Sequence, residues 1–305
     1  MLHLAADVAQ ALDEQRPVVA LESTVISHGL PYPQNLAVAL ALEEEVRAAG
    51  AVPATIGVVA GRLVVGMDGA ALERFATKRE QVRKLTRRDL AVAVAQGADG
   101  ATTVAATMAL AAAAGISVFA TGGIGGVHRG AELNWDVSAD LTELGRTPVL
   151  VVCAGAKAIL DLSATLEYLE TLGVPVVGYQ CHEFPAFYSA QSGLPVSARA
   201  DDAAAAAHLW RVQRALAPMA SPGGMLLCVP PPPTVALGRT AVEAALGRAL
   251  AQATQKNVRG PDVTPFLLAA MAEETNGESV ATNIALLRQN TAVAAAVAVA
   301  LTRQP

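Results

Sequence analysis

The sequence predicts an α/β protein: an α/β/α sandwich with a mostly parallel central sheet covered by helices on both faces. Short apolar runs alternate with helical patterns along the chain, which is typical of parallel strands joined by helices. Hydrophobic residues make up 53% of the 305 residues and charged residues 16%, so a large core can form. Aromatic residues reach only 4%. Small aliphatic side chains must therefore fill the core, as they do where helices pack closely on a sheet.

Short apolar runs bounded by turn residues are the predicted strands. Ala60-Gly61-Arg62 joins two of these runs and predicts a hairpin. The predicted strands cover residues 18–21, 54–59, 63–65, 116–120, 149–153, 174–179 and 225–229.

Helical patterns fill the intervals between the strands and close the chain. They cover residues 35–49, 88–96, 102–114, 158–172, 201–216, 241–254, 265–274 and 281–302. Gly50, Gly97, Gly115 and Gly173 directly follow the first four of these helices, where glycine commonly ends a helix. We expect a single domain over residues 1–305, with the stiff Pro230–Pro233 run marking a possible subdomain seam near residues 218–234.

Composition argues against several classes of protein. The net charge of −5 does not suit a nucleic-acid surface, and the basic residues are scattered apart from a short cluster around Lys84 and Arg87. The three cysteines form no C-x-x-C pair, which favours a reducing cytoplasm over a disulfide framework. No signal peptide is expected. The apolar stretch 102–120 is interrupted by Gly115, and the apolar stretch 292–301 is too short to cross a bilayer. No membrane span is therefore expected.

Ligands of parallel sheets bind at the carboxyl ends of the strands. That rule directs attention to four segments: residues 22–29, 121–130, 155–157 and 180–187. Lys157, one of only four lysines among 22 basic residues, follows an apolar strand and is predicted to open a helix. The helix dipole and apolar flanks would both lower its pKa, and a neutral amine is what a Schiff-base nucleophile needs. The alternative is a surface lysine that reaches out to water.

The segment Thr121-Gly-Gly-Ile-Gly-Gly-Val-His-Arg-Gly130 is a glycine-rich loop after a strand. Its backbone N–H groups, with His128 and Arg129, could bind a phosphate monoester, and the alternative is a flexible glycine loop. The G-x-G-x-x-G spacing and a Walker lysine are both missing, which argues against a dinucleotide-binding dehydrogenase.

Two acidic positions stand at predicted ligand ends. Asp136 and Asp140 flank Ser138 at the start of a helix, where either helix capping or an oxygen-rich Mn²⁺ or Mg²⁺ site is consistent with the pattern. Glu22 ends the first strand and is either a general acid or a capping or salt-bridge carboxylate. Cys181-His182 lacks further ligands at a recognisable spacing, so zinc is not expected.

Several long motifs together resemble a known family. They are Glu22-Ser-Thr-Val-Ile-Ser-His-Gly-Leu-Pro-Tyr-Pro-Gln-Asn35, Gly50-Ala-Val-Pro-Ala-Thr-Ile56, Arg87-Arg-Asp-Leu90, Gly100-Ala-Thr-Thr-Val-Ala105, Phe119-Ala-Thr-Gly-Gly-Ile-Gly-Gly-Val-His-Arg-Gly-Ala-Glu132, Val152-Cys-Ala-Gly-Ala-Lys157, Glu183-Phe-Pro-Ala-Phe187 and Thr264-Pro-Phe-Leu-Leu268. The sequence resembles the pseudouridine-5′-phosphate glycosidases, also called the indigoidine synthase A-like family. The resemblance runs from about residue 17 to residue 290.

The resemblance implies a lyase of the pseudouridylate synthase type, which interconverts pseudouridine 5′-phosphate and water with uracil and ribose 5-phosphate. It also implies a cytoplasmic homotrimer that uses Mn²⁺, with Mg²⁺ or another divalent cation as an alternative. By the same resemblance Lys157 is the nucleophile, Glu22 the proton donor and Asp136 the metal ligand. The implied substrate contacts are Lys84, Val104, Thr121, His128, Ser138, Ala139, Asp140 and Asn283, with Thr121 and His128 on the phosphate and Asn283 on the base.

Two stretches depart from the family pattern. Cys181-His182 stands where a small polar residue and an acid are usual, and residues 230–237 lack the expected acidic pair. A less acidic acceptor pocket would suit a C-glycosynthase that joins ribose 5-phosphate to an aromatic polyketide-type ring. A third hypothesis, from another class, is a non-catalytic phosphosugar-binding protein in which Lys157 does not react.

Overall fold

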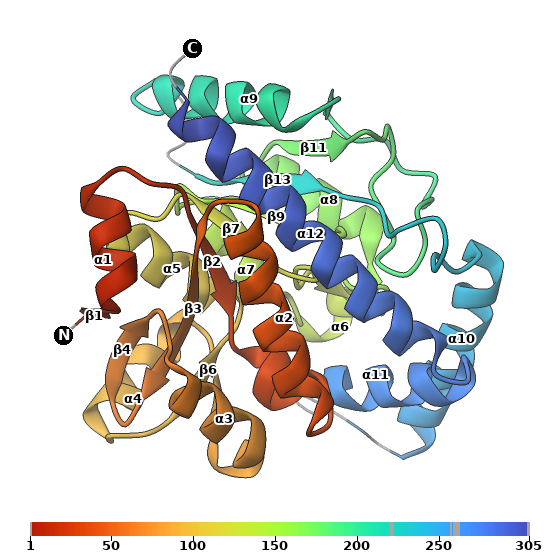
Figure 1. Ribbon diagram of the computed structural model, residues 1–305. Helices are drawn as coiled ribbons and strands as arrows, with labels where there is room; N and C mark the ends of the chain where they lie inside the picture. Colours follow the sequence, from red (N-terminus) through yellow and green to blue (C-terminus); the bar gives the residue numbers. More distant parts are fainter. Residues whose placement is uncertain (1, 220–222, 257, 259–262, 304–305) are drawn as a thin grey trace.

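The computed structural model describes residues 2–219, 223–256, 258 and 263–303. Its strands alternate with helices through most of the chain (Figure 1). The strands are β1 (Leu2–Leu4), β2 (Val18–Glu22), β3 (Val52–Val59), β4 (Arg62–Val65), β5 (Arg83–Leu85), β6 (Gly100–Thr102), β7 (Val118–Ala120), β8 (Val127–His128), β9 (Leu150–Cys153), β10 (Leu160–Asp161), β11 (Val176–Tyr179), β12 (Ala198–Ala200) and β13 (Met225–Cys228).

One eleven-stranded sheet has the main order β1-β4-β3-β2-β7-β9-β13-β11-β12. From β3 through β2, β7, β9, β13 and β11 to β12 every pairing is parallel. The predicted 54–65 hairpin is confirmed, because β3 and β4 pair antiparallel. β6 and β5 branch from β3 outside the main order, and β8 and β10 form a separate two-stranded sheet. The predicted mostly parallel α/β sheet is therefore confirmed.

Helices surround this sheet. They are α1 (Ala6–Asp13), α2 (Gln34–Ala48), α3 (Gly69–Thr77), α4 (Leu90–Ala95), α5 (Val104–Ala114), α6 (Ala131–Asn134), α7 (Ala139–Leu144), α8 (Leu162–Thr171), α9 (Ala203–Leu216), α10 (Arg239–Gln255), α11 (Val263–Glu274) and α12 (Glu278–Thr302), with a π-helical turn at Val25–Gly29 and 3₁₀ turns at Arg79–Gln81 and Arg87–Asp89.

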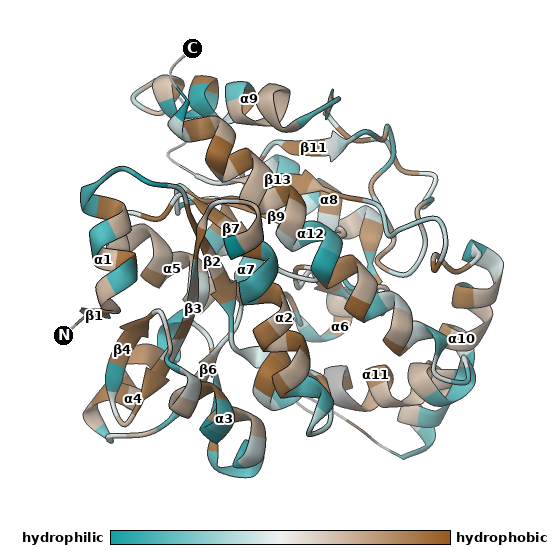
Figure 2. Cartoon of the chain, in the orientation of Figure 1, coloured by the Kyte–Doolittle hydropathy of each residue, from teal (hydrophilic) through white to brown (hydrophobic). Residues whose placement is uncertain are grey.

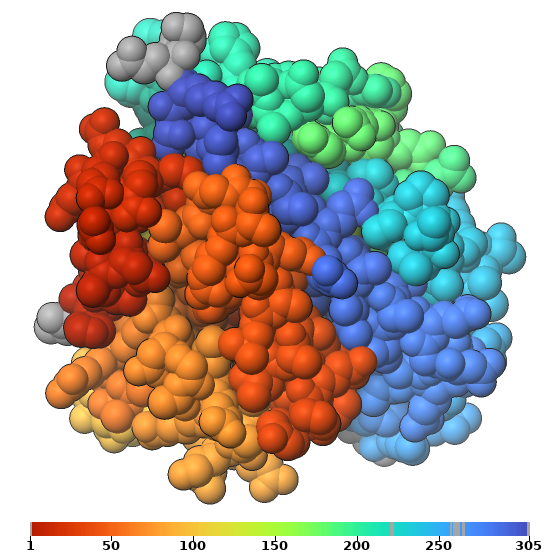
Figure 3. All heavy atoms as spheres, in the orientation of Figure 1, coloured from red at the N-terminus to blue at the C-terminus, as the bar shows by residue number. Residues whose placement is uncertain are grey.

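The two faces of the sheet are covered by different helices. In Figure 1 the orange α2 and the blue α12 cross the near face, and α5 and α8 lie behind the strands. α12 packs against β2, β7 and β9, and also against α2 and α9. The space-filling view shows these N-terminal and C-terminal segments side by side, so that they hide the sheet from this side (Figure 3). The first and last parts of the chain thus cover the same strands.

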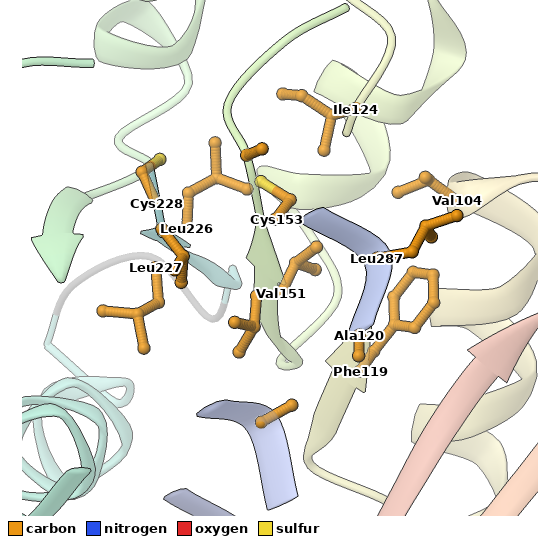
Figure 4. Packing of buried hydrophobic residues seen from close by; sticks show 14 of the residues in the cluster. Val104, Phe119, Ala120, Ile124, Val151, Cys153, Leu226, Leu227, Cys228 and Leu287 are labelled. Atoms are coloured by element: carbon orange, nitrogen blue, oxygen red, sulfur yellow. The ribbon is translucent and has the colours of Figure 1, made fainter. Parts of the chain in front are cut away.

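The core is the contact layer between the central strands and these helices. Phe119 of β7, Val151 of β9 and Leu287 of α12 belong to one continuous cluster of buried side chains (Figure 4). The central strands are brown in the hydropathy view, whereas the helices carry both brown and teal segments (Figure 2). Continuous apolar strands under amphipathic helices are expected where both faces of a parallel sheet are covered.

α12 is long and apolar enough to cross a membrane on length and composition alone. Half of its apolar window is buried inside the protein, however, and it packs against three central strands. A core helix of an α/β protein has this character.

Two helix starts predicted from the sequence are wrong because short strands take their place. The helix predicted from residue 158 begins at Leu162, because Leu160 and Asp161 first pair with β8. The helix predicted from residue 102 begins at Val104, because residues 100–102 form strand β6. A Cβ on Gly100 would lie 2.0 Å from Leu85 Cδ1, so this strand needs a glycine and lacks the usual β-branched signal.

The proposed seam over residues 218–234 includes residues 220–222, which lie outside the described residues. Directly after them β13 is an inner strand of the sheet, between β9 and β11. The single-domain organisation and the seam both stay predictions.

Candidate active site

The candidate site lies at the carboxyl ends of three adjacent parallel strands. β2 ends at Glu22, β7 leads into Thr121, and β9 leads through a short turn to Lys157. β7 pairs with both β2 and β9. Because the neighbouring strands run in the same direction, their three ends meet at one edge, as the ligand rule for such sheets requires.

Two threonine hydroxyls hold the Glu22 carboxylate. Thr121 Oγ1 donates to Glu22 Oε1, and Thr24 Oγ1 donates to Glu22 Oε2. Thr121 is buried, with 1% of its surface exposed. Thr121 was predicted to bind phosphate. In the structure its hydroxyl instead donates a hydrogen bond to Glu22, the predicted proton donor. The pairing of Thr121 with Glu22 was not evident from the sequence, because the two residues are 99 positions apart.

Lys157 stands in an ordered turn and not at the start of a helix. Its backbone N–H donates to Ile124 O at 3.1 Å, and Ile124 N–H donates to Gly155 O at 3.0 Å. Helix α8 starts only at Leu162 and is capped by Asp161. Lys157 therefore precedes the first residue of that helix by five positions, and the prediction that it opens a helix is wrong. What places the half-buried lysine is its pairing with the glycine-rich loop.

The glycines of residues 121–130 allow close packing of this loop. A Cβ on Gly125 would lie 2.2 Å from Ser138 Oγ, and one on Gly126 would lie 2.4 Å from Thr165 Oγ1. Five backbone N–H groups of the loop already donate within the protein, those of Thr121, Ile124, Gly125, Val127 and His128. These five are therefore not free for a phosphate, and the phosphate site at this loop stays a prediction.

Asp140 connects three segments of the site. Its Oδ1 accepts from Ala105 N at 2.9 Å and its Oδ2 from Gly125 N at 2.8 Å. Ser138 caps α7 by accepting from Asp140 N–H, which agrees with the capping interpretation. Asp140 thus holds the N-terminus of α5, where Val104 lies, against the glycine-rich loop.

Lys84 and His128 lie within electrostatic reach of Lys157, and Asp136 lies beside His128. His128 Nδ1 is 3.8 Å from Asp136 Oδ2. Burial is the largest cause lowering the His128 pKa; Asp136 opposes this shift, and Lys157 and Lys84 add to it. His128 is therefore mostly neutral at pH 7 and would meet a phosphate as an uncharged donor.

The pKa of Lys84 is also lowered, first by desolvation and then by the positive charge of Lys157, while Glu22 and Asp140 oppose the shift. Its side chain is nevertheless reached by solvent. The site therefore contains two lysines and two carboxylates in one electrostatic unit.

The donor set around Asp136 fits a largely hydrated divalent cation. The Asp136 side chain is 43% exposed, and the described residues contain no cluster of three or more His, Cys, Asp or Glu side chains able to hold a metal. Mn²⁺ and Mg²⁺ accept one or two carboxylates together with several waters. A single accessible carboxylate is compatible with such an ion, whereas a structural zinc would need a fuller protein ligand set.

α12 contributes two asparagines to the same edge. Asn290 is fully buried and donates to Thr121 O at 2.8 Å, a role that the sequence did not reveal. Asn283 Oδ1 lies 3.5 Å from the position that a Cβ on Gly122 would take. The predicted base contact therefore adjoins the glycine-rich loop.

The two atypical segments differ in how close they come to this site. His182 is exposed and contacts Arg199 of β12, at the edge of the sheet. In residues 230–237, Val235 O accepts from Thr282 Oγ1 at 2.6 Å, and Thr282 precedes Asn283. Only this second segment therefore borders the predicted base contact.

Comparisons with known proteins agree with this geometry. The family model "Indigoidine synthase A like protein" matches residues 7–300. A Chloroflexus aurantiacus protein named pseudouridine-5′-phosphate glycosidase is 73% identical, with 98% of each chain covered. A Staphylococcus aureus protein of the same name is 48% identical over 97% of this chain and 95% of its own length.

Solved structures extend the comparison to three dimensions. The prealnumycin C-glycosynthase AlnA, in complex with ribulose 5-phosphate, superposes with a TM-score of 0.91 at 42% identity, covering 99% of this chain and 97% of its own. An indigoidine synthase A-like protein from Thermotoga maritima gives a TM-score of 0.89 at 35% identity over the same shares. The chain belongs to the indigoidine synthase A-like family.

Proposed function

We propose that this protein is an enzyme that reversibly cleaves the C–C glycosidic bond of pseudouridine 5′-phosphate, giving uracil and ribose 5-phosphate. The observation that carries the proposal is that Lys157 and Glu22, at strand ends on the same edge of the main sheet, form one electrostatic unit with Lys84 of β5. Its full-length relatives of up to 73% identity bear the name of this activity.

A C-glycoside has no ring nitrogen at the sugar that could be protonated to make the base leave. In the direction of bond formation, the Lys157 amine condenses with the aldehyde of ribose 5-phosphate and water leaves. The resulting iminium at C1′ accepts the electron pair of the uracil carbon C5. O4′ then replaces the lysine nitrogen at C1′, and C5 loses its extra proton.

Cleavage reverses these steps. The lysine nitrogen bonds to C1′ as O4′ departs, C5 takes up a proton, and the nitrogen lone pair expels uracil to leave the iminium. Water then releases ribose 5-phosphate and the free amine. Glu22 would give a proton to O4′ or to the base and take it back.

The remaining predicted contacts would position the substrate. Lys84 would pair with the 5′-phosphate as a charge-assisted anchor, and neutral His128 would donate to it. Ser138, Ala139, Asp140 and Val104 would line the sugar, and Asn283 would contact the base. Binding of the phosphate at one end of the substrate would hold C1′ next to Lys157. The two reacting groups would then react within one complex, without having to meet by diffusion.

Asp136 would hold Mn²⁺, or Mg²⁺ in its place. When bound there, such an ion would orient the substrate and stabilise developing negative charge. We further propose that the enzyme is a cytoplasmic homotrimer, which rests on the family resemblance.

Replacement of Asp136 by asparagine should raise the Mn²⁺ concentration needed for half-maximal activity by at least about tenfold, because the amide carries no charge. Mn²⁺ binding itself, measured by electron paramagnetic resonance, should weaken in parallel. Asp201→Asn is the matched control, because Asp201 is 74% exposed and pairs with Arg199 at the far edge of the sheet. Equal Mn²⁺ affinity in Asp136→Asn and wild type would contradict the assignment.

A second candidate is a C-glycosynthase acting on a larger aromatic acceptor. AlnA bears that name at 42% identity, and the non-acidic segment 230–237 borders the predicted base contact through Thr282. The higher identity to the glycosidases favours pseudouridine 5′-phosphate as the substrate.

One pair of measurements tests these hypotheses. The purified protein with Mn²⁺ should release uracil from pseudouridine 5′-phosphate, and borohydride with ribose 5-phosphate should add the reduced sugar to the peptide containing Lys157. Trapping without uracil release, together with consumption of aromatic acceptors, would establish the glycosynthase. If neither trapping nor turnover is observed, the remaining hypothesis is a non-catalytic phosphosugar-binding protein.

A further inference from the structure

A buried glutamate joins helix α7 to the segment that carries Lys84. The Glu143 side chain is fully buried, and each of its oxygens binds a different arginine. Arg87 Nη1 lies 2.6 Å from Oε1, and Arg146 Nη2 lies 2.6 Å from Oε2. Thr147 Oγ1 also donates to Oε1. A buried carboxylate with this many donors is held in one place.

The two arginines differ in what they connect. Arg146 lies three residues after Glu143, so its ion pair stays local. Arg87 lies 56 residues away in the chain and only three residues after Lys84. The Arg87–Glu143 pair is therefore a tertiary link, whereas the Arg146–Glu143 pair is not.

The Lys84 segment is short and peripheral, although Leu85 of β5 is buried in a small apolar cluster. β5 is three residues long and, among the described strands, pairs only with β6, outside the main order of the sheet. Directly after β5 a capping box formed by Thr86 and Asp89 shapes the 3₁₀ turn that carries Arg87. Short peripheral strands of this kind open easily unless tertiary contacts hold them.

The other end of α7 already belongs to the site. Asp140 holds the glycine-rich loop at Gly125, and that loop pairs with the turn of Lys157 through Ile124. One six-residue helix thus connects at its start to the Lys157 side and at its end to the Lys84 side.

We infer that Arg87 and Glu143 are positioning residues, which set the distance from the Lys84 phosphate anchor to the reacting Lys157 through helix α7. The inference rests on the proposed function, because it takes Lys84 to be the contact of the 5′-phosphate. It assigns a role to Arg87, part of the basic cluster that composition alone left unexplained.

Two matched variants test the inference. Arg87→Met and Arg146→Met each remove one ion pair of Glu143 and keep an apolar stem, and the two arginines are similarly exposed, at 46% and 51%. Arg87→Met should raise the KM for pseudouridine 5′-phosphate about tenfold and also lower kcat, because a displaced Lys84 binds the phosphate less tightly and holds C1′ farther from Lys157. Arg146→Met should leave KM close to wild type.

A double-mutant cycle with Lys84→Ala separates positioning from general destabilisation. If Arg87 acts through Lys84, Arg87→Met should add no further increase in KM once Lys84 is gone, whereas independent effects would multiply. Arg87→Lys, which keeps a charge for Glu143, should restore part of the loss.

Equal KM values for Arg87→Met and Arg146→Met, or effects of Arg87→Met and Lys84→Ala that multiply fully, would overturn the inference. Absence of turnover in the wild-type protein would instead overturn the proposed function. The two failures are therefore distinguishable in the same set of assays.

Discussion

Lys157→Ala is expected to fold like the wild type and to lose C–C cleavage by several orders of magnitude. No other group at the site can form the covalent bond to C1′, because Lys84 is assigned to the phosphate. The fold should survive because the turn is held by backbone contacts of Lys157 and Gly155 with Ile124, which alanine keeps. Uracil release measures the loss, and circular dichroism with thermal unfolding checks the fold.

Lys84→Ala is the matched control for this variant, since it removes the other lysine of the same electrostatic unit. Borohydride should still attach ribose to Lys157 in Lys84→Ala, although at a higher ribose 5-phosphate concentration. In Lys157→Ala the adduct should be absent. Near-normal cleavage by Lys157→Ala, or trapping on Lys84 in the wild type, would refute the assignment of the nucleophile.

Glu22→Gln is expected to lower kcat about 10²- to 10⁴-fold, the usual contribution of a positioned proton donor. The change should be nearly isosteric, because the amide can still exchange hydrogen bonds with the Thr24 and Thr121 hydroxyls. Binding of ribose 5-phosphate should therefore weaken little, and the loss should appear in kcat.

Glu183→Gln provides the comparison for this second variant. Glu183 is another partly buried glutamate, but its Oε2 accepts from the backbone of Ser192 and Gly193 in a loop after β11. Its substitution should leave kcat close to wild type. A kcat for Glu22→Gln that matches that of Glu183→Gln would show that Glu22 carries no proton in the rate-limiting step.

Much of the fold follows from local patterns. Apolar runs correctly placed β2, β9 and β11 within a few residues, and the glycines after α2, α4, α5 and α8 correctly marked where these helices end, because strand and helix patterns depend on neighbouring residues. Strands β1, β5, β6, β8, β10 and β12, each of two or three residues, were missed because so short a run carries no periodic signal. Gly100 made this harder, since the strand there requires a residue of low β propensity.

The site, like the fold, was predicted only in part from the sequence. The sequence by itself predicted the candidate reacting residues, Glu22 and Lys157 after strands and Asp136 before α7, because their motifs are contiguous and the parallel sheet brings strand ends together. It did not determine how they are held, and the helix start assigned to Lys157 was wrong.

Only the tertiary structure decided the supporting contacts. Thr121 binds Glu22 across 99 residues, Asn290 holds the glycine-rich loop across 169 residues, and Arg87 reaches Glu143 across 56 residues. Partners this far apart meet only after the sheet has formed and its helices have docked on it. The pattern of neighbouring residues therefore carries the reacting groups, whereas the packed fold selects the groups that aim them.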